Sequence, residues 1–250
     1  MATFKAGGPG AIRFDKIDVA QIANGRRTLA NDHIIQGEIE KDDVITFRGY
    51  GFSYHATGSV KGGTVTSFYE DYQGLKLFTL TGLKVSVTAL YGRVLARDDE
   101  GCLGLLFAKN DKIYGSQYKD YLKGYTGKDL LKGGGGNDSL AGGDGNDTLY
   151  GGAGEDTFIF RVKDGGSDRI ADFSARADKI HIDWAGGRSG VGLDKFVYGS
   201  QASDTEDRVI YDQSTGSIYF DPDGTGYKPQ ILLAKVKPGL GLTDDNFLLI

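Results

Sequence analysis

A nine-residue period in the middle of the chain constrains the fold more than any other feature. Aspartate occupies the sixth position of every unit, and an apolar residue occupies the eighth. The six units, which follow one another without an insertion, are LFAKNDKIY at 106–114, GSQYKDYLK at 115–123, GYTGKDLLK at 124–132, GGGGNDSLA at 133–141, GGDGNDTLY at 142–150 and GGAGEDTFI at 151–159. Such a regular period indicates a chain that adds one small structural unit at a time.

Each unit has the composition of a short strand and a tight turn. Side chains alternate between the two faces of a strand, so the apolar eighth position points inward while its neighbours point outward. The glycine-rich residues before it suit a sharp turn with positive φ angles. Two units then form one coil of 18 residues, and the chain winds into two parallel sheets. The predicted inward side chains are Ile113, Leu131 and Leu149 in one sheet, and Leu122, Leu140 and Phe158 in the other.

This winding places the aspartates in two columns, one along each edge of the coil. Neighbouring carboxylates in a column lie about one strand spacing apart, ~4.8 Å. At that distance they repel by roughly 1 kcal/mol even in bulk water. Residues 133–159 contain five acids and no Lys or Arg, so the compensating charge has to come from a bound cation. Calcium, which accepts six to eight oxygen ligands in flexible geometry, suits carboxylates and turn carbonyls better than magnesium does.

The units resemble the nonapeptide G-G-x-G-x-D-x-U-x of RTX (hemolysin-type calcium-binding) proteins. The match is strict over 133–159 and degenerate over 106–132. The resemblance implies several Ca²⁺ ions, each held between turns two units apart. The earlier turn would supply the carbonyls of its second and fourth positions and its aspartate. The later turn would supply the carbonyls of its first and third positions and its aspartate.

Transferred to this chain, the resemblance implies three sets of ligands. The first set is Gly134, Gly136 and Asp138 with Gly151, Ala153 and Asp156. The second set is Tyr125, Gly127 and Asp129 with Gly142, Asp144 and Asp147. The third set is Ser116, Tyr118 and Asp120 with Gly133, Gly135 and Asp138. The remaining glycines of the strict turns, Gly143, Gly145, Gly152 and Gly154, complete the candidate metal site.

The degenerate units leave two interpretations open. The units at 106 and 115 lack the paired glycines and have Lys109 and Tyr118 at the fourth position, so they form either calcium sites or turns that bind nothing. Asp111 is accordingly expected to be structural or solvated. In the strict units, the apolar column in phase with the acids argues against a surface loop without a ligand.

The flanks predict a mainly β protein, with a right-handed parallel β-roll at 106–160 between two β-rich regions. Residues 1–105 alternate polar and apolar side chains in several stretches and are expected to form an N-terminal cap with one or two short helices. The first helix is expected over 87–96, and the second after Asp98 or Asp99, ending near Phe107. Residues 161–250 form the C-terminal β region, with a hairpin over 207–227.

Two motifs in the C-terminal region have more than one interpretation. The segment 158–182 resembles the end of RTX repeats, where D-x-I-x-D-F closes the roll, so Asp168 and Asp172 either ligate the last calcium ions or serve as turn and capping residues. The loop DPDGTG at 221–226 resembles the start of an EF-hand loop. Because the twelfth position is Leu232 rather than Glu, a polar turn is favoured over a metal site there.

The resemblance also implies a route of export. The final residues DDNFLLI resemble an uncleaved type I secretion signal, and they also suit a final strand. The first residues lack the pattern of a conventional signal peptide, and one cysteine excludes an internal disulfide. We therefore expect a type I secretion ABC transporter as a partner, and a secreted, extracellular or cell-surface protein of a Gram-negative bacterium. No apolar run reaches the roughly 18 residues of a membrane span, and no basic stripe predicts nucleic acid as a partner.

No catalytic motif is recognisable. The histidines His33, His55 and His181 lie outside any H-E-x-x-H pattern, and G-x-S-x-G is absent. The sequence therefore predicts a non-catalytic protein with a structural or surface role, although a carboxylate-pair glycosidase stays open because its acids need no fixed spacing. The alternatives are a calcium-dependent adhesin for a surface polysaccharide, using Tyr50, Tyr54, Tyr69 and Tyr72, and an accessory to a secreted hydrolase.

Overall fold

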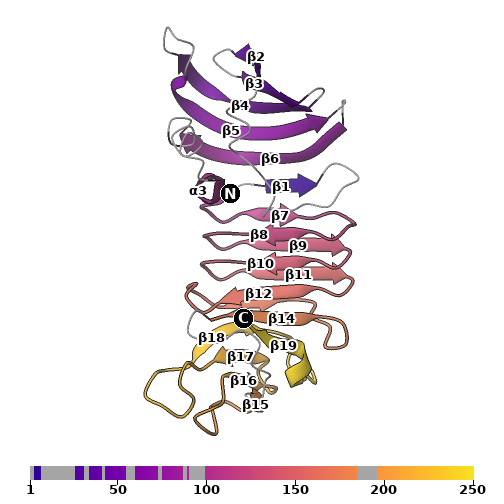
Figure 1. Cartoon of the computed structure of the whole chain (residues 1–250), viewed down its shortest axis with the longest axis vertical. Helices are drawn as coiled ribbons and strands as arrows, with labels where there is room; N and C mark the ends of the chain where they lie inside the picture. The colour runs from indigo at the N-terminus through magenta and orange to yellow at the C-terminus, as the bar shows by residue number, and fades with distance from the viewer. Residues whose placement is uncertain are drawn as a thin grey trace.

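The computed structural model shows an elongated stack of strands, with N-terminal strands at one end, C-terminal strands at the other and both chain termini between the two ends (Figure 1). It describes residues 3–6, 26–30, 34–40, 43–54, 60–72, 75–86, 89, 99–184 and 196–250. All the described strands belong to two sheets, one of 14 strands and one of five. Among the described residues, no helix is long and apolar enough to cross a membrane.

The middle of the molecule is a parallel β-roll, as the sequence predicts. The larger sheet contains β7 (Lys112–Tyr114), β9 (Leu130–Gly135), β11 (Thr148–Ala153) and β13 (Asp168–Ile170), paired in parallel. The smaller sheet contains β8 (Tyr121–Lys123), β10 (Ser139–Ala141), β12 (Thr157–Arg161) and β14 (Lys179–Asp183), also paired in parallel. The chain alternates between the sheets with every unit, so the turns line up along the two edges of the roll.

Apolar side chains at the eighth position fill the space between the sheets. Ile113, Leu131 and Leu149 are aligned in the larger sheet and have no exposed surface. Leu122, Leu140 and Phe158 are equally buried in the smaller sheet. The predicted division of inward residues between two sheets is confirmed. Burial of each such side chain contributes about 1.5–3 kcal/mol, so the column is the main source of stability in a region otherwise rich in glycine.

The parallel pairing continues beyond residue 160, the end of the roll expected from the sequence. Ile170 in β13 and Ile180 in β14 extend the two apolar columns, although three or four additional residues precede each strand. Two C-terminal strands then finish the stack. β18 (Ile231–Lys235) pairs in parallel with β13, and β19 (Phe247–Leu249) pairs in parallel with β14.

The N-terminal strands form an antiparallel continuation of the larger sheet. They are β2 (Arg26–Ala30), β3 (Ile34–Glu40), β4 (Asp43–Tyr54), β5 (Val60–Tyr72) and β6 (Leu75–Ser86). β1 (Thr3–Ala6) lies between β6 and β7, antiparallel to the first and parallel to the second. β1 therefore joins the antiparallel strands to the roll through backbone hydrogen bonds.

A short helix lies at the start of the roll. The helix α3 (Asp99–Leu106) occupies the place of the second predicted helix, and Leu103, Leu106 and Phe107 are buried in the same core as the roll. The core is thus covered where the first coil begins. The first predicted helix, over 87–96, lies outside the described residues except for Ala89.

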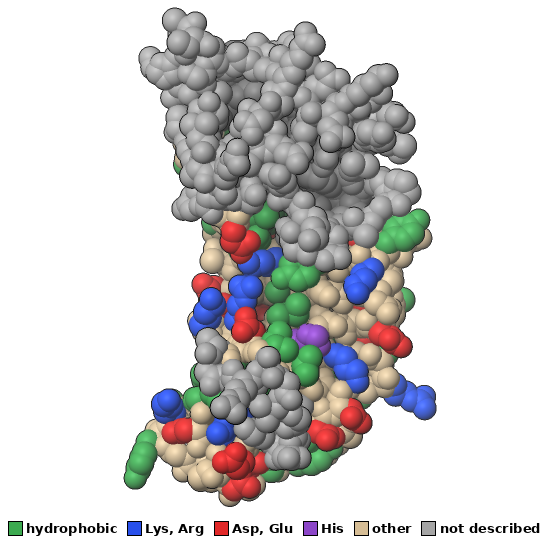
Figure 2. Space-filling model, viewed as in Figure 1, with side chains coloured by type: hydrophobic (Ala, Val, Ile, Leu, Met, Phe, Trp, Pro, Cys, Tyr) green, Lys and Arg blue, Asp and Glu red, His purple; other side chains and the backbone are tan. Residues whose placement is uncertain are grey.

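The C-terminal region contributes a smaller unit. It contains β15 (Phe196–Tyr198), β16 (Val209–Asp212), β17 (Ser217–Phe220) and the 3₁₀ helix η2 (Asp244–Asn246). In this unit β15 and β16 pair in parallel, and β16 and β17 pair antiparallel. β16 and β17 form the hairpin predicted from the sequence. On the face of the molecule in Figure 2, hydrophobic side chains form a column along the roll, with basic and acidic side chains on both sides.

Candidate metal centre

The aspartates of the repeat form two buried columns at the edges of the roll, which we call the rims. The first rim contains Asp111, Asp129, Asp147 and Asp168, and the second contains Asp120, Asp138, Asp156 and Asp178. All eight side chains are at most 5% exposed. Buried acids of one sign in such number require a compensating partner.

Backbone hydrogen bonds join the acids of each rim into a ladder. The amide of Asp129 donates to Oδ1 of Asp147 at 2.7 Å, and the amide of Asp147 donates to Oδ1 of Asp168 at 2.9 Å. On the second rim, the amide of Asp138 donates to Oδ1 of Asp156 at 2.9 Å. One oxygen of each carboxylate is therefore used to hold successive coils in register.

The second oxygen is different. Among the described residues, Oδ2 of Asp129, Asp138, Asp147 and Asp156 is buried and has no hydrogen-bond partner. Leaving a buried polar group unsatisfied costs about 1–3 kcal/mol, and more when the group is charged. Four such oxygens in regular positions indicate that the rims bind something that the polypeptide itself does not supply.

Glycine at the first position of each unit opens the space next to these oxygens. A Cβ added at Gly133 would lie 2.2 Å from Oδ2 of Asp138 and 2.6 Å from the carbonyl oxygen of Gly151. A Cβ at Gly142 would lie 2.3 Å from Oδ2 of Asp147 and 2.8 Å from Oδ2 of Asp168. Carboxylate and carbonyl oxygens thus surround a point that only glycine leaves open, and oxygen ligands of this kind suit calcium.

The fourth position of the strict turns also requires glycine. Gly145 has a φ of 136°, and a Cβ there would lie 1.6 Å from the carbonyl oxygen of Gly127 in the preceding coil. The turns therefore stack with carbonyl groups in close contact, an arrangement that a larger residue would prevent.

Loss of solvent on burial raises the pKa of the rim carboxyls. The pKa of Asp129 rises to about 8 and that of Asp138 to about 7, with burial as the main cause and neighbouring carboxylates adding to it. Burial likewise raises the pKa of Asp156. Backbone hydrogen bonds oppose these shifts but do not outweigh burial. In the metal-free protein the rims therefore favour bound protons, and a divalent cation would replace them.

The turn at 115–120 uses its aspartate differently. Ser116 donates its amide to Oδ2 of Asp120 at 2.5 Å and its hydroxyl to Oδ1 at 3.1 Å. The hydroxyl oxygen of Ser116 also accepts a hydrogen bond from the amide of Tyr118 at 3.0 Å. The third predicted ligand set thus contains a carboxylate that the turn itself already satisfies.

Tyr125 shows how the next unit retains the turn without the usual glycine. Its φ of 71° is the only positive value of a non-glycine among the described residues. Its ring stacks on Phe107 with centroids 6.1 Å apart, and the ammonium of Lys123 lies 4.3 Å from its centroid. Since a left-handed conformation costs roughly 1–2 kcal/mol, these contacts help to hold the second predicted ligand set in place.

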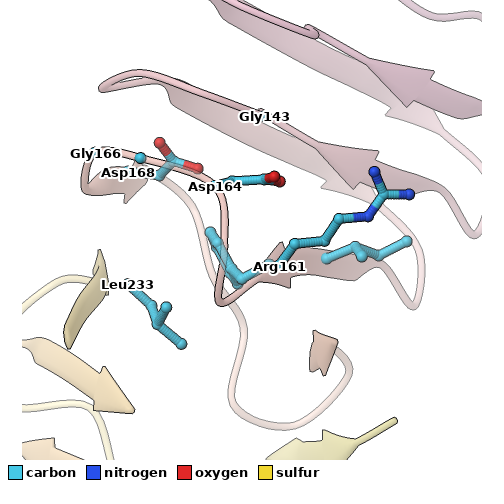
Figure 3. A pocket seen from close by; sticks show the side chains of 9 residues that line it. Gly143, Arg161, Asp164, Gly166, Asp168 and Leu233 are labelled. Atoms are coloured by element: carbon cyan, nitrogen blue, oxygen red, sulfur yellow. The ribbon is translucent and has the colours of Figure 1, made fainter. Parts of the chain in front are cut away.

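The last turn of the first rim lines a small hollow of about 20 Å³ that is partly open to solvent (Figure 3). Gly143, Gly166, Asp164 and Asp168 line it, together with the chain of Arg161. Burial, reinforced by the carboxylate of Asp147, raises the pKa of Asp168 to about 8. Burial also raises the pKa of Asp164. The structure therefore places Asp168 opposite Asp147 at an additional site of the rim.

Asp172 has another position. It lies at the surface, and its two carboxylate oxygens accept hydrogen bonds from the amides of Gly151 and Gly152 at 3.0 and 3.1 Å. This is the contact of an aspartate that caps a turn. Asp111 is buried, and its amide donates to Asp129 as the first rung of the first rim.

Sequence reasoning missed Asp178, which continues the second rim. Its Oδ1 accepts the amide of Asp156 at 3.1 Å, and its Oδ2 accepts the amide of Ser174 at 2.8 Å. The spacing from Asp156 is 22 residues instead of 18, so a strict nine-residue search passes over it. The sequence signal that could have identified Asp178 is the spacing within each repeat, where an apolar residue follows two positions after the aspartate. Asp178 and Ile180 have this spacing.

Hydrogen bonds within the DPDGTG loop hold it as a turn. The carboxylate of Asp223 accepts the amides of Tyr227 and Lys228 at 3.0 and 3.2 Å, and Asp221 accepts the amide of Asp223 at 3.1 Å. In the described part of the chain, no group of three or more His, Cys, Asp or Glu side chains is placed to hold a metal ion. A cation on the rims would thus combine pairs of carboxylates with backbone carbonyls.

Comparison with a protein-family model agrees with the repeat. The family model of the RTX calcium-binding nonapeptide repeat, in four copies, matches residues 107–140 and 133–160. The solution structure of the AlgE6R3 subunit from the Azotobacter vinelandii mannuronan C5-epimerase is 27% identical, over 56% of this chain and 78% of that chain, with a TM-score of 0.37. No curated protein matches the chain. The matched residues contain the six nine-residue units except Leu106.

Proposed function

We propose that this protein, whose residues 107–160 are RTX calcium-binding nonapeptide repeats, is a secreted protein in which the roll folds as it binds several Ca²⁺ ions outside the cell. Its role there would be structural, at or near the surface of a Gram-negative bacterium, without catalysis. A type I secretion ABC transporter would be its export partner, as the resemblance to RTX proteins implies.

The observation that carries this proposal is the set of buried Oδ2 atoms without a partner on Asp129, Asp138, Asp147 and Asp156. The ion would supply positive charge between carboxylates that otherwise repel. One site would use Asp138 and Asp156, with carbonyls of Gly134, Gly136, Gly151 and Ala153. A second would use Asp129 and Asp147, with carbonyls of Tyr125, Gly127, Gly142 and Asp144. A third would use Asp147 and Asp168.

Coupling between binding and folding follows from the same geometry. The rim carboxylates come together only when the coils stack, so the unfolded chain has no formed site, and the free energy of binding stabilises the folded state. Other calcium sites in extracellular modules bind the ion with Kd values of about 10⁻⁴–10⁻³ M, and we infer the same range for the rims. Such weak sites would stay empty in the cytosol and fill outside the cell.

The test is to count bound ions and follow folding on the same protein. Circular dichroism in chelator should show a loss of β signal that calcium restores and sodium does not, and calorimetry should count more than one ion. Asp138→Asn should lower the ion count, whereas Glu155→Gln, on an exposed residue in the neighbouring turn, should leave it unchanged. Equal β signal with and without calcium, or no measurable binding, would overturn the proposal.

Export has its own test. The full chain, expressed with and without a type I transporter, should reach the medium only when the transporter is present. The adhesin alternative rests on Tyr50, Tyr54, Tyr69 and Tyr72, whose side chains lie outside what the structure describes. It therefore gains no support from the geometry of the N-terminal region.

A further inference from the structure

The outward face of the larger sheet carries basic side chains and no acid over five neighbouring strands. The strand register aligns Lys112, Leu130, Thr148, Arg169 and Lys235 in one column across β7, β9, β11, β13 and β18. A second column beside it contains Tyr114, Lys132 and Tyr150. We call these eight residues the basic face. The only acid in the five strands is Asp168, whose side chain is buried.

The cations of the basic face take no part in the ion pairs formed among the described residues. In the described part of the chain, no ion pair involves Lys112, Lys132, Arg169 or Lys235. On the smaller sheet, by contrast, Lys123 pairs with Glu100, and Arg161 lies 3.4 Å from Asp183. Charge is therefore compensated on one side of the roll and left uncompensated on the other.

The side chains of the basic face lie at regular positions on the surface of the sheet. The side chains of Lys132, Arg169 and Lys235 are exposed, and Tyr114 and Tyr150 are partly exposed. The ammonium of Lys132 lies 4.9 Å from the centroid of the Tyr150 ring, a cation–π contact that holds it over the sheet. Strands lie about 4.8 Å apart, so the column from Lys112 to Lys235 extends over roughly 19 Å.

This arrangement is complementary to a linear chain that carries negative charges at short, regular intervals. Lysine and arginine would pair with the charges, and the tyrosines provide amphipathic rings against which sugar rings pack. We propose that the basic face binds an extended acidic polysaccharide. Alternation of Tyr114, Lys132 and Tyr150 favours a polymer in which a sugar ring accompanies each carboxylate.

Calcium on the rims would strengthen this binding. The rim carboxylates lie at the edges of the same sheet, and without calcium their negative charge opposes a polyanion. With calcium bound, the positive field of the basic face is no longer cancelled. The polysaccharide should therefore bind only to the calcium-loaded protein.

The test uses the full chain at saturating calcium and low salt, with a soluble oligouronate as the probe and the same oligosaccharide with reduced carboxyl groups as its neutral counterpart. The triple variant Lys132→Gln, Arg169→Gln and Lys235→Gln should bind the oligouronate roughly tenfold more weakly, since each exposed charge contributes a small increment. Binding by the unchanged protein should weaken as salt rises, and the neutral oligosaccharide should not bind.

A matched control removes the same charges elsewhere. Lys119→Gln, Arg176→Gln and Lys228→Gln lie on exposed turns away from the basic face and should bind within twofold of the unchanged protein. Equal loss in both triple variants, equal binding of the neutral oligosaccharide, or tighter binding of single-stranded DNA than of the oligouronate would overturn the proposal. Circular dichroism of each sample reports calcium-dependent folding, so failure of glycan binding is distinguishable from failure of the calcium sites.

Discussion

The strict turns at 133–159 and the degenerate turns at 106–132 have the same strands but different capacities for a ligand. Leu122 and Leu140 are equally buried, and both halves continue the same aspartate ladders. However, Oδ2 of Asp138 has no protein partner, whereas the carboxylate of Asp120 accepts two hydrogen bonds from Ser116. The apolar eighth position and the ladder are thus enough to form the coil in both halves. Within the described residues of the degenerate half, Oδ2 of Asp129 also has no hydrogen-bond partner, so the difference between the halves lies at the turn 115–120, where Ser116 already satisfies the carboxylate.

The largest contrast should come from removing one carboxylate in each half. Asp147 lies between Asp129 and Asp168, so Asp147→Asn should remove two calcium sites. The loss is about 2.7 kcal/mol of stability per site when calcium is a hundredfold above its Kd. Asp120→Asn should leave the ion count unchanged. Calorimetric ion counts and thermal unfolding in calcium would measure both, and equal losses in the two variants would refute the difference between the halves.

Substitutions in the apolar column should not distinguish the halves. Leu140→Ala and Leu122→Ala each remove a fully buried side chain and should each destabilise the calcium-loaded protein by about 2–5 kcal/mol. Chemical denaturation at fixed calcium gives the two values. A much smaller cost for Leu122→Ala would mean that the degenerate half is held together by something other than its core.

A strict turn should be transferable to the degenerate half. The double variant Ser116→Gly and Tyr118→Gly removes the hydrogen bond from the Ser116 hydroxyl to Asp120. It also places glycine at the second and fourth positions, where positive φ angles can turn the backbone amide of residue 116 away from Asp120. We expect one additional calcium ion by calorimetry. The matched double variant Ser116→Ala and Tyr118→Ala removes the same side chains without giving glycine its freedom at positive φ, and it should add none.

The smallest effect should be a pH dependence of the metal-free roll. Burial raises the pKa of Asp138 to about 7 and that of Asp147 to about 6, above the ~3.9 expected in the unfolded chain. Since the unfolded chain loses these protons first as pH rises, the metal-free roll is most stable below about pH 4 and loses stability up to about pH 7.

The protein in chelator should therefore keep more β signal, and unfold at a higher temperature, at about pH 5 than at about pH 8. Saturating calcium should reverse the order, because deprotonated carboxylates bind the ion. A chelated roll that becomes more stable as pH rises would contradict this assignment of the buried acids.

The repeat made much of the roll predictable. A period with aspartate at the sixth position and an apolar residue at the eighth was sufficient to assign Leu131 and Leu140 to opposite sheets. Each of these placements depends on residues within 18 positions in the chain, where the regular spacing leaves one register.

Prediction failed where the spacing changed. Asp178 continues the second rim after 22 residues and was missed, because the additional residues hide it from a periodic search. Asp168, 21 residues after Asp147, was a candidate only through the resemblance of its segment to the end of RTX repeats. The hydrogen bonds from Ser116 to the carboxylate of Asp120 could not be predicted either. A serine at the second position of a turn is compatible with several local hydrogen-bond patterns.

The sequence by itself determined the coil, its inward column and the presence of two acidic edges, since all three follow from the alternation of side chains along strands of fixed spacing. Tertiary structure decided where the roll ends and which carboxylates remain without a partner. β1, β18 and β19 add to the stack from distant parts of the chain, and their pairing depends on long-range contacts that no local pattern encodes. The basic face likewise exists only because parallel register aligns residues that lie 18 or more positions apart.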